Sequence, residues 1–423
     1  MSAQRLGRSL AVAPLLMLCG ARVQFTHAAE VVASALPDDA TARDALEHAP
    51  TIVMARELIA QGQATQSKLA TGSHEWEIFV TDRKRTERTG RSYREQEFEL
   101  SRGLRLPGKR SLDLEIGQQT ADNSQFAFED AWHEAGRTLL AGWFSWLRAE
   151  RMSLVRSELR DTQQSAVASV ARRVRAGDAP ALEQRLAQSE LQRAEYELTQ
   201  SRQAAQVART QLLKEYPTLQ LRLPTALPEP RPLEGSDAEW MDHVVKSNHE
   251  IKLADGRSAA ASLEAQRARL ERVADPTIGV IYSDNFDQNR NTIGIKVSVP
   301  LGGRARGADA ELAASHARVA AAEAQLASLR VTGDARQDLA NRHAYFDQWA
   351  SLADAAHQAQ QNAAAYARGY SGGEFDLLTM LNAQQVAAQA RLAAETAQLN
   401  VLEADARLRL DAHRMWTADN DAD

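Results

Sequence analysis

An internal repeat constrains the fold of this chain more than any other feature. Residues 174–188 align with residues 370–384 at a constant offset of 196 positions. A second similarity joins residues 100–110 to residues 296–304 at an offset near 194. The chain therefore contains two copies of one unit. The identities in the first alignment are Gly177 with Gly373, Leu182 with Leu378, and Ala187-Gln188 with Ala383-Gln384. We interpret Gly177, Leu182, Gly373 and Leu378 as residues of the turns in the repeat motif.

Proline marks the boundary between the two copies. Five prolines fall between Pro217 and Gly235, a density that neither a helix nor a central strand accepts. We interpret this stretch as a linker. The predicted organisation is a signal peptide (1–28), a first repeat with a helix, a strand pair and long helices (29–216), the linker (217–235), a second repeat (236–416) and a C-terminal tail (417–423).

The N-terminus has the pattern of an export signal. Arg5 and Arg8 precede an apolar stretch that is too short to span a bilayer, and Thr26-His27-Ala28 offers a small-x-small cleavage site. Cleavage would remove three arginines and no acid, which changes the formal net charge from −6 to −9 and argues against a nucleic-acid partner. Cys19 is the only cysteine, and lipidation at this residue is the alternative processing route.

Long helices are predicted after each strand pair. Aromatic residues make up only 5% of the chain, as expected where helices pack through narrow seams. The 65 or so residues from Arg304 to Arg368 lack proline and would form a helix about 100 Å long. The last helix carries two apolar stripes, one through Leu399 and Leu402 and one through Ala397 and Val401. A dimeric coiled coil, the alternative interpretation, would use only one stripe per helix.

Between the helices the hydrophobic period changes to two. Ile293, Ile295, Val297 and Val299 alternate with small or charged residues, and similar alternation occurs near residues 76–80, 98–100 and 278–282. A transmembrane barrel with a wet lumen has this pattern, and so does a half-buried soluble sheet. No segment after the signal has about 18 consecutive apolar residues. Four strands are too few to close a barrel, whereas three chains would supply twelve.

These features together resemble the TolC family of outer-membrane efflux proteins over nearly the whole mature chain, from about Thr41 to Trp416. The resemblance rests on the export signal, the tandem halves, the strand ending in Val-Pro-Leu-Gly-Gly-Arg (299–304), and Arg-Gly-Tyr-Ser-Gly-Gly-Glu-Phe-Asp-Leu-Leu (368–378) followed by Ala-Gln. It implies a mainly α fold with a small β part, in which each protomer gives four strands to a shared twelve-stranded barrel and long helices to a periplasmic α-barrel.

The resemblance also implies the function and the partners. The family forms homotrimers in the outer membrane of Gram-negative bacteria that act as passive conduits for export. Its partners are outer-membrane lipid, a periplasmic adaptor (membrane fusion protein) and an inner-membrane pump, here of the resistance-nodulation-division type. The compact length is similar to the CzcC-like heavy-metal subgroup, while drug-exporting and type I secretion relatives share the scaffold. The cargo, drug, metal cation or polypeptide, stays open.

Some family members close the periplasmic aperture with a leucine, an aspartate and an arginine. By alignment Leu378 matches the leucine, but Asn382 and Gln385 stand where the two charges would be. A salt-bridge latch is therefore not expected. Glu374 and Asp376 could supply an acidic ring instead and favour cations, although acids at a helix start also have a purely local explanation.

We expect neither enzymatic activity nor a cofactor. Residues 369–373 have the form Gly-x-Ser-x-Gly, but Gly372 and Gly373 are interpreted as turn residues of the repeat motif; residues 103–109 have the form Gly-x4-Gly-Lys, but Arg110 follows where a phosphate-binding loop has serine or threonine. The sequence has no His-Glu-x-x-His pattern and no pair of histidines at helical ligand spacing. A metal site is likewise not expected. The alternative from another functional class is a periplasmic coiled-coil adaptor or structural protein. A third possibility, an envelope hydrolase, is not favoured because the sequence offers no candidate pocket residue for it.

Overall fold

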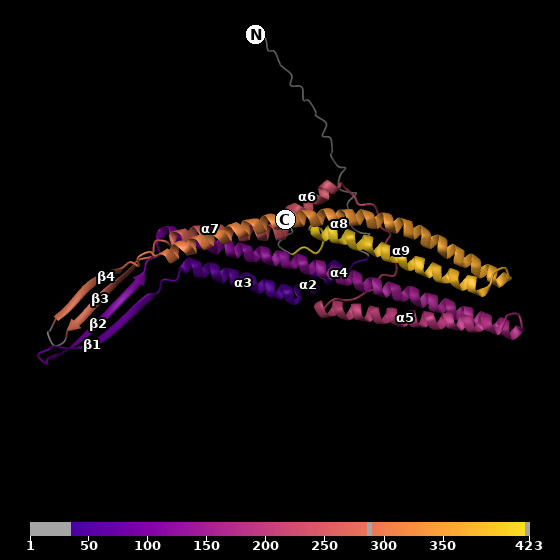
Figure 1. Cartoon of the computed structure of the whole chain (residues 1–423), viewed down its shortest axis with the longest axis horizontal. Helices are drawn as coiled ribbons and strands as arrows, with labels where there is room; N and C mark the ends of the chain where they lie inside the picture. The colour runs from indigo at the N-terminus through magenta and orange to yellow at the C-terminus, as the bar shows by residue number, and fades with distance from the viewer. Residues whose placement is uncertain (1–34, 286–289, 419–423) are drawn as a thin grey trace, which may run out of the picture.

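The structure is a computed structural model that describes residues 35–285 and 290–418. The predicted signal peptide, Cys19 and the last residues of the tail lie outside these ranges. The molecule is long and narrow, with a small sheet at one end and helices along the rest of its length (Figure 1). None of the helices in the described ranges is both long and apolar enough to cross a membrane.

The same order of elements occurs twice, which confirms the tandem repeat. Helices α3 and α7 each have 22 residues, and α5 and α9 each have 35. The long helices α4 and α8 have 70 and 69 residues. The first unit contains α2 (Asp39–Glu47), α3 (Pro50–Thr71), β1 (Trp76–Thr86), β2 (Ser92–Gly103), α4 (Pro107–Ala176) and α5 (Ala181–Glu215). The second contains α6 (Asp237–Ser247), α7 (His249–Leu270), β3 (Thr277–Asn285), β4 (Arg290–Ser298), α8 (Arg304–Gly372) and α9 (Leu377–Asp411).

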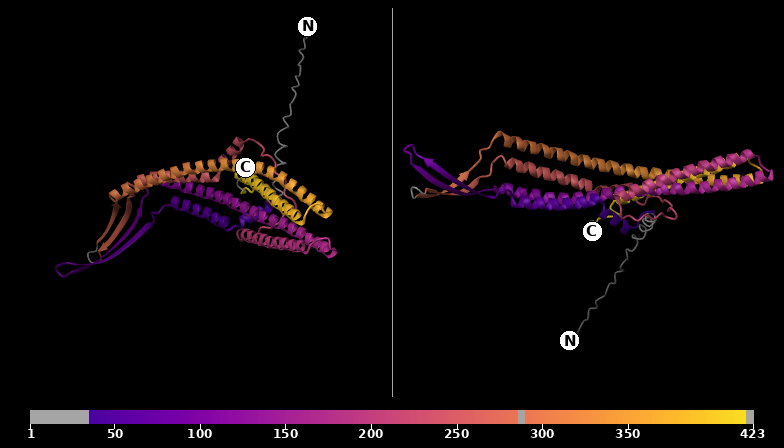
Figure 2. Two further views of the ribbon diagram at one scale, coloured as in Figure 1. Left: turned by 45° about the vertical axis from the view of Figure 1, so that its right-hand side comes forward. Right: turned by 90° about the horizontal axis from the view of Figure 1, so that it is seen from below.

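The helices form a curved wall one layer thick (Figure 2). Helix α4 contacts α3 and α5 on one side and α7 and α9 on the other, and α8 contacts α7 and α9. Across the wall, the helices are therefore arranged in the order α3/α5, α4, α7/α9, α8. The pair α3/α5 forms one free edge, and α8 forms the other. Helix α9 buries residues of both stripes that the sequence indicated, because it packs between α4 and α8.

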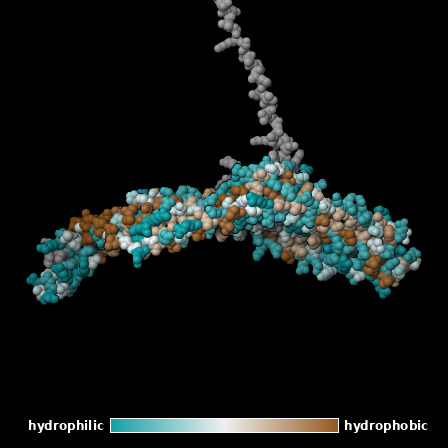
Figure 3. Space-filling model, turned by 45° about the horizontal axis from the view of Figure 1, so that its top comes forward, coloured by the Kyte–Doolittle hydropathy of each residue, from teal (hydrophilic) through white to brown (hydrophobic). Residues whose placement is uncertain are grey.

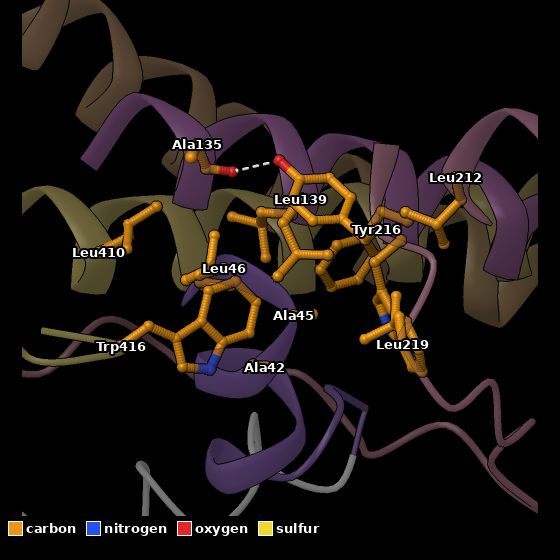
Figure 4. Close-up of a cluster of buried hydrophobic side chains, with 14 of the residues drawn as sticks. Ala42, Ala45, Leu46, Ala135, Leu139, Leu212, Tyr216, Leu219, Leu410 and Trp416 are labelled. Atoms are coloured by element: carbon orange, nitrogen blue, oxygen red, sulfur yellow. Dashed lines mark hydrogen bonds between the residues drawn. The ribbon is translucent and has the colours of Figure 1, made fainter. Parts of the chain in front are cut away.

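The largest hydrophobic core lies halfway along the wall, where the shorter helices end. Leu46 of α2 and Leu139 of α4 are fully buried there, and Trp416 folds back onto them (Figure 4). The hydroxyl of Tyr216 donates a hydrogen bond of 2.7 Å to the carbonyl oxygen of Ala135. This core holds the two repeats and the C-terminal turn together.

The four strands form one antiparallel sheet in the order β1-β2-β3-β4. The pairing of β2 with β3 joins the two repeats, so each outer strand of the sheet has one unpaired edge among the described residues. Strand β4 ends at Ser298. Val299, which the sequence placed on the strand, therefore lies just beyond it, because the hydrophobic alternation continues after the strand pairing stops.

Candidate functional surfaces

One face of the sheet is apolar and exposed. The register places Ile78, Leu100, Val280 and Ile295 side by side in one row across all four strands. Ile295 is 80% exposed. Hydrophobic residues gather on the part of the sheet nearest the helices, and hydrophilic residues cover its outer end (Figure 3). The two flanking rows are Val80, Phe98, Tyr282 and Ile293, and Trp76, Arg102, Ile278 and Val297.

The opposite face of the sheet is mostly polar, with Phe79 and Ile281 as its large apolar residues. Glu99 of β2 accepts hydrogen bonds of 2.9 and 3.0 Å from the ammonium group of Lys296 on β4. Arg83 of β1 pairs with Glu97 at 2.5 Å. Because neighbouring residues of a strand point to opposite faces, the sheet has one face suited to lipid and one suited to water.

The dimensions of the sheet match those of a membrane-spanning barrel wall. Its strands have 9 to 12 residues, and a tilted transmembrane strand needs about 9–11. Unpaired strand edges expose backbone N–H and C=O groups, which the hydrocarbon region of a bilayer cannot satisfy. Among the described residues, the outer edges of β1 and β4 have no partner strand.

A buried ionic network connects the sheet to the helices. Lys109 at the start of α4 is 1% exposed. Its ammonium group donates to the carbonyl oxygen of Val273 at 2.7 Å and pairs with the carboxylate of Asp275 at 2.9 Å. Nearby, Arg105 pairs with Asp113 at 2.8 Å. These contacts tie β3 and the chain before α4 together, and so fix the direction in which the strands leave the helices.

The far end of the wall consists of two helical hairpins with matching turns. Gly177 and Gly373 each end a long helix with φ of +82°, a conformation that favours glycine. Each amide donates to a carbonyl three residues earlier at 3.1 Å. Leu182 and Leu378 occupy the same position in the following helices, and both are exposed. The repeat motif thus encodes the hairpin turns.

The predicted aperture residues all lie at the end of the α8–α9 hairpin. Asp376 caps α9 and accepts a hydrogen bond of 2.7 Å from the amide of Thr379, which lowers the pKa of Asp376. This contact supports the explanation that an acid stands at position 376 because it caps the helix. Glu374, Leu378 and Asn382 are exposed. Gln385 lies about two turns after the start of α9 and is half-buried.

Sequence reasoning missed the contact that joins the two hairpins. Tyr370 of α8 is buried, and the guanidinium carbon of Arg173 on α4 lies 4.8 Å from its ring centroid. The tyrosine hydroxyl donates to the carboxylate of Glu183 on α5 at 3.3 Å. Burial raises the pKa of Tyr370, so the hydroxyl keeps its proton. Tyr370 differs from the residue at the equivalent position of the first repeat, Val174, and this difference is the only signal for it in the sequence.

Three histidines meet at the middle of the wall. His249 at the start of α7 lies 3.2 Å from His413 of the C-terminal turn, measured between ring nitrogens. His133 of α4 stacks on His413 with ring centroids 5.5 Å apart. His133 also contacts the buried carboxylate of Asp411 at 3.2 Å, and His249 contacts Glu129 at 3.1 Å. The cluster connects both repeats to the chain end.

The C-terminal turn is expected to lose stability in acid. Burial, His249, His133 and Lys252 together lower the pKa of His413 to about 3, from 6.5. Because the folded state keeps His413 uncharged, the unfolded state binds the proton more readily. The free energy of unfolding is therefore highest above pH 6.5 and decreases as the pH falls towards 3. Burial alone would raise the pKa of Asp411, but the contact with His133 and the hydrogen bond from Arg137 lower it. Protonation of this carboxylate in acid therefore also lowers the stability of the turn.

His413→Asn tests this expectation. Asparagine tolerates the positive φ of 55° at this position and does not titrate. The fall in thermal midpoint between pH 7.5 and 4.5 should be smaller in the variant than in the wild type. His316→Asn, at an exposed site, should leave the fall unchanged. An equal fall in wild type and His413→Asn would contradict the assignment.

In the part of the chain that the structure describes, no group of three or more histidine, cysteine or acidic residues is placed to hold a metal ion. The surfaces that stand out are the two-faced sheet, the hairpin ends and the free edges of the wall.

Comparison with solved structures identifies this arrangement. Crystal structures of CusC align with a TM-score of 0.74 and 13% identity, covering 88% of this chain and 91% of that one. The outer-membrane protein VceC of Vibrio cholerae aligns with a TM-score of 0.73 and 15% identity, over 89% and 96% of the two chains. The outer-membrane channel CmeC of Campylobacter jejuni aligns with a TM-score of 0.76 and 12% identity, over 90% and 87%.

The chain has the TolC-like fold. The mainly helical architecture, the small antiparallel sheet and the tandem repeat expected from the sequence are thereby confirmed. No protein-family model and no curated protein matches the chain. The likeness to the TolC-like structures is therefore carried by the arrangement of the elements, with few identical residues.

Proposed function

We propose that this chain is the subunit of a homotrimeric outer-membrane channel, a passive conduit for export across the periplasm and outer membrane. The observation that carries the proposal is the sheet, which exposes an apolar face and two unpaired edges. The backbone N–H and C=O groups at these edges are satisfied when strands of other copies pair with them, and the apolar face is buried when lipid covers it. Three copies would supply twelve strands, and a threefold arrangement closes.

The helical wall would continue the barrel into the periplasm. A helix of 70 residues, such as α4, is about 105 Å long. Three copies of the wall, joined at their free edges, would enclose a lumen below the barrel. The competing interpretation, a periplasmic coiled-coil adaptor or structural protein, leaves the exposed apolar face of the sheet unexplained.

The hairpin ends are the proposed site of contact with a periplasmic adaptor, which would link the channel to an inner-membrane pump of the resistance-nodulation-division type. Energised transport would then lie in the pump. Small molecules or metal cations are the proposed cargo, with type I secretion as the alternative within the same fold. Glu374 and Asp376 of three copies would place acids around the aperture, an arrangement that favours cations.

Purification from outer membranes followed by conductance measurements in planar bilayers tests the proposal. Trimers that insert and conduct ions would support it. A protein recovered only as soluble dimers or filaments, without conductance, would support the coiled-coil alternative instead.

Tyr370→Phe is expected to favour the open state of such a channel. The substitution removes the hydroxyl that donates to Glu183 while the ring still packs on Arg173. Loss of one such hydrogen bond per copy costs about 0.5–1.5 kcal/mol in the closed arrangement. Bilayer recordings should show a larger open fraction. Tyr366→Phe, whose ring packs on Phe375, is the matched control and should behave as wild type. An unchanged open fraction in Tyr370→Phe would show that the hydrogen bond from Tyr370 to Glu183 does not hold the channel closed.

A further inference from the structure

The hairpin formed by β1 and β2 reaches farther from the helices than the rest of the sheet (Figure 1). The last residue pair between β2 and β3 joins Glu95 with Asn285. Beyond this pair, β1 and β2 continue for three more pairs, the outermost of which joins Thr86 with Ser92. The tip of the β1–β2 hairpin therefore stands clear of β3 and β4.

This projecting hairpin is basic, although the chain as a whole is acidic. Residues 82–96 contain six lysine and arginine residues and three acidic residues, which gives a formal charge of +3 in a chain of −6. In the second repeat, residues 284–291 contain one arginine and two aspartates. Asp82, Gln96, Asp284 and Asn291 lie in one row across the sheet, so both stretches are counted from the same level. The tandem repeat does not account for the positive charge, because only one copy carries it.

Half of the six cations lack an acidic partner. Three pair with acids of the neighbouring strand, namely Arg83 with Glu97, Arg85 with Glu95, and Arg94 with Asp82. The other three, Lys84, Arg88 and Arg91, are exposed and form no ion pair with any described residue. These three side chains are therefore available to an anion from outside the chain.

Lys84 and Arg94 lie directly opposite each other on β1 and β2. They are four residues from Val80 and Phe98, which belong to the last apolar row, and residues an even number apart on a strand share a face. Two like charges directly opposite each other destabilise a strand pair. Asp82 compensates the charge of Arg94, whereas no described acid pairs with Lys84. An anion bound between the two cations would remove the repulsion.

These cations lie at the level that lipid headgroups occupy. Four residues of a strand span about 14 Å, and a tilt of about 45° reduces this to about 10 Å along the membrane normal. With the apolar rows in the hydrocarbon core, Lys84 and Arg94 lie in the headgroup region or just outside it, and their long side chains can reach back towards it. The hairpin tip is at the opposite end of the sheet from the helices (Figure 1). Because the helices extend into the periplasm in the proposed channel, the tip faces the outer leaflet.

We propose that Lys84, Arg88, Arg91 and Arg94 bind the phosphate groups of the glycolipid in the outer leaflet of the outer membrane. The inference rests on the proposed outer-membrane channel and names the chemistry of the lipid at one end of its barrel. Arginine donates two parallel hydrogen bonds to a phosphate, and lysine supplies a compact positive charge, so the hairpin offers the donors that a phosphate monoester accepts. Three copies would place three such hairpins around the outer rim of the barrel.

Titration of the full-length trimer in detergent micelles with lipid A, which carries two phosphate monoesters, tests the proposal. Native mass spectrometry counts the lipids bound to each trimer. The variant Lys84→Gln/Arg88→Gln/Arg91→Gln should bind lipid A at least about tenfold more weakly than the wild type, because each cation near an anionic surface contributes about fivefold in affinity. Wild-type binding should also weaken as the ionic strength rises, and dephosphorylated lipid A should bind the wild type no better than lipid A binds the variant.

Arg185→Gln/Arg202→Gln/Arg209→Gln is the matched control, since it removes the same charge from exposed positions of α5. This control should bind lipid A as the wild type does. Equal losses in the two triple variants, or equally tight wild-type binding of phosphatidylglycerol, a phosphodiester lipid, would overturn the proposed site. Conductance of the same preparations in planar bilayers separates this proposal from the channel function. Conducting trimers with unchanged lipid A binding in the hairpin variant would overturn the lipid site alone, whereas a wild type without trimers or conductance would overturn both proposals.

Discussion

Arginine in place of Ile295 is expected to abolish assembly of the protein in the outer membrane. Ile295 lies in the central row of the apolar face and is 80% exposed in one chain. An arginine facing the middle of a bilayer costs about 2–4 kcal/mol. A homotrimer would carry three such residues in one barrel, so the penalty is large compared with the stability of a typical protein domain. Quantitation of trimers in outer-membrane fractions gives the result.

Thr292→Arg is the matched control for this substitution. Thr292 lies on the same strand but on the polar face, paired with Ser283. Its side chain would point to a wet lumen, where arginine carries little cost, so assembly should be close to normal and any change should concern conductance. Normal trimer yield for Ile295→Arg would show that the apolar face does not contact lipid.

The two faces of the sheet could be predicted from the sequence because a strand encodes its orientation locally. Alternating residues such as Ile293 and Ile295 point to one side whatever the strand pairs with. The same rule also explains the error at Val299, where the alternation runs past the last paired residue. The pattern specifies a face, whereas the partner strand specifies where the strand ends.

The hairpin turns could be predicted for a different reason. The repeat places Gly177 and Gly373 at equivalent positions. Glycine at the same position of both repeats indicates a backbone conformation that other residues adopt poorly. The aperture was less accessible from the sequence. Asp376 acts as a helix cap, which is a sufficient local reason for an acid at this position. The sequence alone is equally compatible with this explanation and with a role in ion passage.

Contacts between distant segments left little trace in the sequence pattern. Tyr370 meets Arg173 and Glu183 only because two hairpins lie side by side, and His413 meets His133 only through a turn after the last helix. Neither contact follows a helical or strand period. Such residues come together through the fold as a whole, which a one-dimensional pattern does not record.

Asp405→Ala is expected to cause the largest loss of subunit stability. Asp405 of α9 accepts hydrogen bonds of 2.6 and 3.3 Å from the guanidinium group of Arg342 on α8, and Arg342 is 1% exposed. The same guanidinium also donates to the carbonyl oxygen of Arg231 in the linker. Removal of the carboxylate leaves a buried, unpaired positive charge, which costs about 3–5 kcal/mol. Thermal unfolding followed by circular dichroism measures the loss.

Two further variants separate the buried charge from the loss of packing. Arg318→Ala removes an ion pair with Glu311 in which both side chains are largely exposed, so the thermal midpoint should hardly move. The double variant Arg342→Met/Asp405→Leu removes both charges and keeps apolar volume, and it should recover much of the stability lost in Asp405→Ala. If the double variant is as unstable as Asp405→Ala, the loss of the hydrogen bond from Arg342 to the linker carbonyl cancels what is gained by removing the buried charge. That outcome would make the linker a structural part of the wall, because the guanidinium of Arg342 is the group that attaches it to α8.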